Sequence, residues 1–177
     1  MNIGIVGLGR MGAAMAERLR QQGFEVIGWD HNPVANETLA AGGLRVAANP
    51  QGVAAVSEIV ISSITEDHGV RRIFSGPGGF FDTDVKGKLF IEMSTLQPMT
   101  GRELAPLVEA KGARLIEAPV LGTIPQVRNG TLLAMVGGSS ENLDRARPVL
   151  EKLTRRIAQE LKASGAYDTM LQSAIPH

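Results

Sequence analysis

Short apolar runs alternate with segments of helical periodicity along most of the 177-residue chain. The apolar runs have the length and composition of buried strands, and the segments between them repeat apolar residues at the spacing of amphipathic helices. This alternation predicts an α/β fold with a mainly parallel sheet and helices on both faces. Strands are expected at 1–6, 25–29, 44–47, 58–64, 88–93, 114–118, 131–136 and 155–159. Helices are expected at 13–19, 34–41, 50–56, 67–74, 98–111, 139–153 and 166–174.

Two helix starts carry recognisable capping residues. Asn49-Pro50 is typical of an N-cap followed by Pro at the first helical position. Ser139 or Ser140 is expected to cap the helix that follows, because a hydroxyl can accept a hydrogen bond from an N–H of the first turn.

A glycine-rich turn joins the first strand to the first helix. It has the spacing G-x-G-x-x-G and lies between an apolar strand and a run of helix formers. The first glycine permits a tight turn, the second lets a pyrophosphate approach the backbone, and the third lets the helix pack close to the strand. The N–H groups and dipole of the helix start favour an anion at this point. The candidate dinucleotide-binding residues of the turn are Gly7, Leu8, Gly9, Arg10, Met11 and Gly12.

An acidic residue follows the second apolar run. Asp30 lies 18 positions after Gly12, close to the offset of about 20 residues expected for the acid that binds the ribose hydroxyls. Strand, glycine turn, helix, strand and acid in this order predict a Rossmann-type, doubly wound, dinucleotide-binding domain. A carboxylate repels a 2′-phosphate, and the stretch 31–41 has no Arg to receive one, so we expect NAD, with NADP as the alternative. His31 and Asn32 are further candidates for cofactor contact, although His31 also fits an exposed loop histidine.

The composition excludes several classes of partner and site. Eighteen basic residues offset eighteen acidic ones, and no basic stripe or cluster indicates a nucleic acid or a membrane surface. The chain has no Cys, which excludes disulfides, zinc–thiolate sites and a Cys nucleophile and suits a cytoplasmic protein. No apolar run is long enough to span a membrane, and no signal peptide is expected. We expect a dinucleotide-binding domain over 1–160.

Four blocks of residues, taken in order, resemble the β-hydroxyacid dehydrogenase superfamily. This superfamily includes 3-hydroxyisobutyrate dehydrogenase, 6-phosphogluconate dehydrogenase and the imine reductases. The blocks resemble, in turn, its cofactor signature, a loop, the strand end beside the nicotinamide and the substrate-binding motif. They are Gly7–Ala16, Phe74–Gly79, Glu92–Thr95, and Glu117–Thr123 with Gly130–Leu133 after it.

The resemblance implies hydride transfer between a nicotinamide cofactor and a small-molecule substrate, either a 3-hydroxy acid or semialdehyde, or an imine. The cofactor carries that chemistry, and the protein positions it and supplies a proton. Ile64 and Thr65 would flank the path of the dinucleotide, and Thr95 would lie near the nicotinamide. The substrate loop would comprise Leu121, Gly122 and Thr123.

Two departures from the family pattern affect the chemistry. Leu121 stands where the family has a Ser that would bind a substrate carboxylate. Thr169 stands at the position of the family's proton-transferring Lys, and Thr is a poor general acid near neutral pH. Asp168 is the alternative, because Tyr167-Asp168 is similar to the run in which imine reductases use an Asp instead of the Lys. The same Asp also fits an exposed residue in the first turn of a helix, so its role stays open.

Members of the superfamily continue into an all-helical domain that closes the active site and builds a dimer. The resemblance implies that 161–177 is the start of the interdomain helix that leads there, and it extends no further along the superfamily members. Two interpretations follow: an oxidoreductase domain that is active only with the helical domain, and a cofactor-binding module without turnover. In both cases the expected partner is a second copy, forming a homodimer, or the missing helical domain, because apolar residues would line one face of the last helix. Those residues are Ala166, Met170, Leu171 and Ala174.

Overall fold

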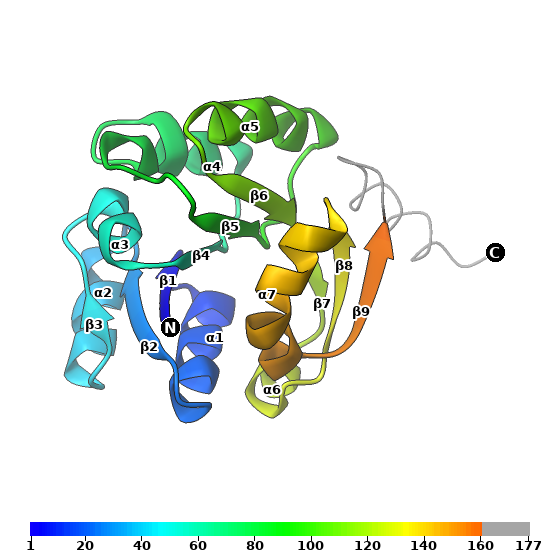
Figure 1. Ribbon diagram of the computed structural model, residues 1–177. Coiled ribbons are helices and arrows are strands. Elements are labelled where there is room, and N and C mark those ends of the chain that lie inside the picture. Colours follow the sequence, from blue (N-terminus) through cyan, green and yellow to red (C-terminus); the bar gives the residue numbers. More distant parts are fainter. Residues whose placement is uncertain (161–177) are drawn as a thin grey trace.

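Nine strands form a single sheet in residues 1–160, the part of the chain that the computed structural model describes (Figure 1). The strands are β1 (Asn2–Val6), β2 (Glu25–Trp29), β3 (Arg45–Val46), β4 (Ile59–Ser62), β5 (Leu89–Glu92), β6 (Arg114–Glu117), β7 (Val120–Leu121), β8 (Leu132–Gly137) and β9 (Thr154–Glu160). The helices are α1 (Arg10–Gln21), α2 (Pro33–Ala41), α3 (Pro50–Val56), α4 (Asp67–Ser75), α5 (Pro98–Ala110), α6 (Ile124–Asn129) and α7 (Ser140–Leu153), with a 3₁₀ turn η1 (Phe80–Asp82). The helix expected at 166–174 and the catalytic candidates Asp168 and Thr169 lie outside the described residues.

The first six strands are parallel and take the order β3-β2-β1-β4-β5-β6. The order reverses between β1 and β4, and doubly wound folds bind ligands beyond the carboxyl ends of the strands at such a point. Beyond β6, β8 is antiparallel to β6 and β7, whereas β9 runs parallel to β8. The predicted Rossmann-type fold with a mainly parallel sheet is therefore confirmed.

Alternate side chains of the central strands enter two separate cores, one on each face of the sheet. In β4, Ile59 and Ile61 belong to the core formed with α1 and α7, whereas Val60 belongs to the core formed with α3, α4 and α5. The same alternation places Phe90 of β5 in the second core. Figure 1 shows α1 and α7 on one side of the strands and α3 to α5 on the other. Burial on both faces explains why these strands are continuous apolar runs in the sequence.

All of the elements expected in residues 1–160 are confirmed, with ends that differ by at most three residues. The two predicted caps are also present: Asn49 accepts a hydrogen bond from the Gly52 N–H at 2.8 Å, and Ser139 accepts one from the Asn142 N–H at 3.1 Å. No strand or helix was expected in the stretch 119–130, where β7 and α6 form. Both are too short to show a hydrophobic period, and the same holds for η1.

Candidate dinucleotide site

The glycine turn between β1 and α1 lies at the carboxyl edge of the sheet, beside the point where the strand order reverses. Gly7 has a φ of +98°, and a Cβ built on it would lie 2.1 Å from the carbonyl oxygen of Ser63. A Cβ on Gly12 would lie 1.7 Å from the carbonyl oxygen of Gly7. Only glycine at both positions lets the chain turn here and lets α1 pack this close to β1.

The front of the turn is open. A Cβ built on Gly9 would meet no atom within 4 Å. Gly9 is the N-cap of α1, and the first turn of this helix contains no acidic residue. The first N–H groups of a helix have no partner within the helix and form the positive end of its dipole. The residues present therefore fit a diphosphate, which would occupy the space that a side chain at position 9 would enter.

Asp30 is joined to the glycine turn through its carboxylate. Its Oδ2 accepts a hydrogen bond from the Leu8 N–H at 2.6 Å, and its Oδ1 accepts one from the Asn32 N–H at 2.8 Å. His31 is an exposed loop residue whose Nδ1 lies 3.3 Å from Oδ1 of Asp30. Each carboxylate oxygen retains a second lone pair. Asp30 can therefore hold the turn in place and still accept hydrogen bonds from ribose hydroxyls.

A residue that the sequence analysis did not single out holds the backbone of Asp30. Oδ1 of Asn36 in α2 accepts a hydrogen bond from the Asp30 N–H at 2.8 Å, and its Nδ2 donates one to the Asp30 carbonyl at 2.7 Å. This amide replaces a strand neighbour where β2 leaves the sheet. The position of the carboxylate is thus fixed from both its backbone and its side chain.

The loops that follow β4 and β5 are tied to each other. The Ser94 hydroxyl accepts a hydrogen bond from the Ile64 N–H at 2.8 Å. The carboxyl group of Glu92 accepts hydrogen bonds from the Ser94 N–H, at 2.9 Å, and from the Ser62 hydroxyl. Ile64 also reaches the glycine turn, because its Cδ1 lies 3.0 Å from the place of a Cβ on Gly7. The turn and the ends of β4 and β5 therefore form one continuous edge.

A second link joins the same two loops further from the sheet. Oδ2 of Asp67, at the start of α4, accepts hydrogen bonds from the Gln97 N–H, at 3.0 Å, and from the Thr100 hydroxyl. The predicted cofactor contacts Thr65 and Thr95 are both exposed on the loops that this link holds together.

Glu92 is a functional candidate that the sequence analysis quoted within a motif without giving it a role. Its side chain is 1% exposed at the end of β5. Burial raises the pKa of the Glu92 carboxyl to about 7, although the hydrogen bonds from Ser62 and Ser94 act in the opposite direction. The charge of Glu117 on β6 raises this pKa further. The available signal was a single acidic residue at the end of a buried apolar strand.

The substrate-loop candidates lie beside the start of α1. Gly122 and Thr123 line a hollow of about 420 Å³ together with Arg10 and Met11 of the glycine motif. The fold therefore places the predicted substrate loop against the glycine motif, although the two are far apart in the sequence. Leu121 is not among the residues that line this hollow, and its side chain is 40% exposed in β7.

The conformation of this loop requires a glycine and a helix start. Gly122 has a φ of +151°, and a Cβ on it would lie 2.5 Å from Cδ2 of Leu132. The Thr123 N–H donates a hydrogen bond to Oε1 of Gln126 at 2.7 Å, where α6 begins. These contacts fix the loop next to the N-terminus of α1.

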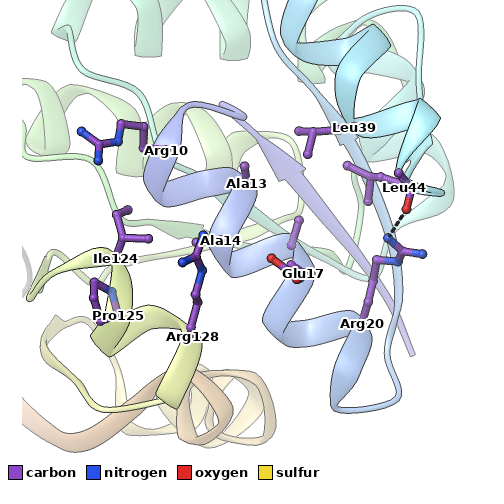
Figure 2. Close-up of a pocket in the computed structure, with 12 residues that line it drawn as sticks. Arg10, Ala13, Ala14, Glu17, Arg20, Leu39, Leu44, Ile124, Pro125 and Arg128 are labelled. Carbon is purple, nitrogen blue, oxygen red and sulfur yellow. Dashed lines mark hydrogen bonds between the residues drawn. The ribbon is translucent and has the colours of Figure 1, made fainter.

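A second hollow, of about 670 Å³, lies on the outer face of α1 (Figure 2). Figure 2 shows Ile124, Pro125 and Arg128 of α6 on one side of α1, and Leu39 and Leu44 on the other. Neither Asp30 nor the loop after β4 lines it. It is thus a different place from the expected path of the dinucleotide.

Within residues 1–160, no group of three or more His, Cys, Asp or Glu side chains is placed to hold a metal ion. None of the helices in the same range combines the length and the apolar character needed to cross a membrane.

Comparison with protein families and curated sequences agrees with the arrangement of this edge. Residues 2–161 match the family described as the NAD binding domain of 6-phosphogluconate dehydrogenase. The mitochondrial 3-hydroxyisobutyrate dehydrogenase of Mus musculus is 34% identical over 149 residues, which are 84% of this chain and 44% of that protein. The chain thus spans about half the length of the curated relatives it matches.

Solved structures of a dehydrogenase and a reductase are also similar to this chain. A 3-hydroxyisobutyrate dehydrogenase from Mycobacterium tuberculosis with L-serine has a TM-score of 0.88 and 32% identity, covering 97% of this chain and 58% of that one. An imine reductase from Streptomyces aurantiacus has a TM-score of 0.87 and 25% identity, covering 98% of this chain and 60% of that one.

Proposed function

The chain belongs to the family of the NAD binding domain of 6-phosphogluconate dehydrogenase, and from this premise we propose that it serves a dehydrogenase of small 3-hydroxy acids or their semialdehydes. One observation carries the proposal. The carboxylate of Asp30, the open front of Gly9 and the loop containing Gly122 lie along one edge, where the strand order reverses. A ribose, a diphosphate and a substrate each find a suitable group there.

Each part of the dinucleotide is assigned to residues of this chain. Asp30, with His31 and Asn32 beside it, would bind the adenosine ribose, and the N–H groups at the start of α1 would bind the diphosphate. Ile64, Thr65 and Thr95 would line the path toward the nicotinamide. When bound, the cofactor supplies the hydride chemistry, and these residues hold and orient it.

We propose NAD as the preferred cofactor, with NADP as the alternative. The carboxylate of Asp30 accepts hydrogen bonds from two backbone N–H groups, so the group at the proposed ribose site is a hydrogen-bond acceptor that suits ribose hydroxyls. A 2′-phosphate at the same place would meet a negative charge, and the stretch 31–41 offers no Arg to offset it.

The substrate proposal rests on the hollow between the glycine motif and the predicted substrate loop. Gly122 and Thr123 face Arg10 and Met11, so the loop lies close to the proposed diphosphate site. An acid substrate would find backbone N–H groups and the cation of Arg10 in this region, although Leu121 offers no hydroxyl. The relatives from Mus musculus and Mycobacterium tuberculosis are named for a small hydroxy acid, which supports this class.

An imine substrate is the second candidate. It is supported by the likeness to the imine reductase of Streptomyces aurantiacus and by Asp168, which lies outside the described residues. A carboxylate there would favour a cationic iminium. The Asp168→Asn variant would then lose imine reduction by at least about tenfold, a typical loss for a removed acid–base group. Unchanged turnover of cyclic imines would contradict the imine proposal.

Assembly and location remain part of the proposal. We propose a homodimer, or pairing with a helical domain, in which the second body would cover the substrate loop around Gly122 and Thr123. A cytoplasmic location fits a chain without Cys. A module that binds the cofactor without turnover is the remaining alternative, because Thr169 stands where the family has its Lys.

Fluorescence titration with NADH and NADPH tests the binding proposal directly. We expect saturable binding of NADH, at least about tenfold tighter than binding of NADPH, as one unfavourable charge contact would produce. Assays with 3-hydroxyisobutyrate-type acids and cyclic imines then separate the two enzyme proposals from the module. Failure of both nucleotides to bind at millimolar concentration would overturn the proposed function.

A further inference from the structure

A chain of hydrogen bonds begins at a buried carboxyl group and ends at the backbone of the loop after β4. Glu92 lies in register with Ser62 on β4 and with Glu117 on β6. Its Oε2 accepts a hydrogen bond from the Ser62 hydroxyl, and its Oε1 accepts one from the Ser94 N–H at 2.9 Å. The Ser94 hydroxyl then accepts a hydrogen bond from the Ile64 N–H at 2.8 Å. Glu92 therefore connects the two loops that follow β4 and β5.

The groups around Glu92 suit an ionised carboxylate. An ionised carboxylate has only acceptors, and here a hydroxyl and a backbone N–H both point at it. After protonation the carboxyl needs an acceptor for its own O–H, so the Ser62 hydroxyl must reverse its direction. The hydrogen bond from the Ser94 N–H also loses its charge assistance. The ionised form is thus the one that holds Ser94, and through it Ile64, more firmly.

Burial is the main reason why this change falls close to neutral pH. It raises the pKa of the Glu92 carboxyl to about 7, and the charge of Glu117, which faces Glu92 from β6, raises this pKa further. The helices that follow β4 and β5 contribute Asp67, which binds the Gln97 N–H, and an ion pair of 3.1 Å between Arg71 and Glu103. Both members of this pair are about half exposed, so solvent screens their effect on the buried carboxyl.

We propose that Glu92 is a positioning residue for the nicotinamide end of the dinucleotide: its ionised carboxylate fixes the loops that carry Ile64, Thr65 and Thr95, and its protonation weakens dinucleotide binding. Glu92 is buried behind these loops, so it acts through Ser94 and not by touching the cofactor. This inference rests on the proposed function, because it assigns the two loops to the cofactor path.

Calorimetric titration of NAD⁺ into the full chain between pH 6 and 8 tests the proposal. We expect the affinity to rise about fivefold with pH, the effect of turning one neutral hydrogen bond into a charge-assisted one. The midpoint should lie near the Glu92 pKa of about 7. The Glu92→Gln variant keeps the shape of the side chain and cannot titrate. It should bind NAD⁺ at all pH values about as weakly as the wild type does at pH 6.

A matched control addresses the imidazole beside the proposed ribose site. His31 is exposed, and its Nδ1 lies 3.3 Å from Oδ1 of Asp30. The His31→Gln variant should keep the rise in affinity with pH, even if its affinity differs in absolute terms.

Carbon-13 NMR of the glutamate carboxyl groups gives a readout on the unmodified protein. The Glu92 signal is identified by its loss in the Glu92→Gln variant or by its titration near neutral pH. Saturation with NAD⁺ should lower the pKa of Glu92, because a ligand that prefers the ionised form stabilises it. A purely structural glutamate would show the same pKa in the free and bound protein.

The outcomes separate this inference from the proposed function. NAD⁺ binding that is independent of pH, or a Glu92→Gln variant that retains the pH dependence, overturns the role of Glu92 and leaves the proposed function in place. An unchanged Glu92 pKa on NAD⁺ saturation overturns it as well. The absence of binding at every pH overturns the proposed function, and this inference with it.

Discussion

The carboxylate of Asp30 accepts a hydrogen bond of 2.6 Å from the backbone N–H of Leu8, and this bond joins the end of β2 to the glycine turn. The residue proposed for the ribose therefore also fixes the first residues of the segment proposed for the diphosphate. The two subsites act as one unit, so a change at Asp30 should affect both binding and folding.

Replacement of Asp30 by Asn should weaken the fold and the cofactor site together. The carboxylate accepts from the N–H groups of Leu8 and Asn32, and an amide offers only one oxygen to two donors. One of these N–H groups, the buried one of Leu8 or the part-buried one of Asn32, then lacks a partner, which costs about 1–3 kcal/mol of unfolding free energy. Urea denaturation measures the loss, and we expect NADH affinity to fall at least about tenfold.

The His31→Gln variant is the control for stability, because the His31 side chain is 86% exposed. Its free energy of unfolding should change by less than about 0.5 kcal/mol, as for other surface substitutions. An Asp30→Asn protein as stable as the wild type would contradict the dual role of Asp30.

Cofactor preference should be reversible at the same place. The double variant Asp30→Asn with His31→Arg removes the charge that repels a 2′-phosphate and adds a guanidinium that can bind it. We expect the ratio of NADPH to NADH affinity, measured by fluorescence titration, to increase by about a hundredfold, which corresponds to two changed charge contacts. The His31→Arg variant, which keeps Asp30, should show a much smaller increase. An unchanged ratio in the double variant would show that the ribose lies elsewhere.

Replacement of Gly9 by alanine should reduce NADH affinity with little effect on stability, whereas replacement of Gly12 by alanine should reduce stability. A methyl group on Gly9 meets no atom within 4 Å, so Gly9→Ala should keep its stability within about 1 kcal/mol. It would occupy the proposed diphosphate space, and NADH affinity should fall at least about tenfold. A methyl group on Gly12 would lie 1.7 Å from the carbonyl oxygen of Gly7, so Gly12→Ala should lose more than about 3 kcal/mol or fail to fold. Tight NADH binding by Gly9→Ala, measured by fluorescence, would contradict the diphosphate assignment.

The parts of the site that the sequence predicted are those encoded by neighbouring residues. The glycine turn and Asp30 belong to one strand–helix–strand unit, and the roles of Gly7 and Gly12 follow from the space around one turn. The strands of the parallel sheet could also be predicted from the sequence, because burial on both faces makes them continuous apolar runs.

The parts that escaped prediction depend on contacts between distant segments. Glu92 owes its burial and raised pKa to β4 and β6, which lie on either side of it only after the sheet has formed. The approach of Gly122 to Arg10 likewise depends on how β7 and α6 return toward α1. The side-chain amide of Asn36 pairs with the backbone of Asp30 across a turn that has no periodic signal.

The stability of the domain should depend on the ionisation of Glu92. Its pKa is about 7 in the folded protein, compared with 4.5 for an ordinary glutamate. Between these values the folded state holds a proton that the unfolded state has lost, so the contribution of Glu92 to stability is complete below pH 4.5. It is lost progressively as the pH rises to about 7. The total loss is roughly 3 kcal/mol, from about 1.4 kcal/mol for each unit of pKa shift.

The Glu92→Gln variant does not titrate, so its unfolding free energy relative to wild type should increase as the pH rises from 5 to 8. Urea denaturation of both proteins at several pH values measures this difference. Glu103→Gln is the control, because Glu103 is about half exposed in an ion pair with Arg71. The difference in unfolding free energy between this variant and the wild type should vary by less than about 0.5 kcal/mol over the same pH range. If the difference in unfolding free energy between Glu92→Gln and the wild type is the same at every pH, the raised pKa of Glu92 is contradicted.

Ionisation of Glu92 thus has opposite effects on folding and on the proposed binding. At pH 8 the carboxylate costs folding free energy because it is buried, and it holds Ser94 through a charge-assisted hydrogen bond. A group of this kind persists where function requires it, since replacing it commonly stabilises a protein at the expense of activity. At pH 8 the Glu92→Gln variant should therefore be both more stable than the wild type and a weaker binder of NAD⁺. A variant that is more stable and binds NAD⁺ as tightly as the wild type would leave Glu92 as a structural residue alone.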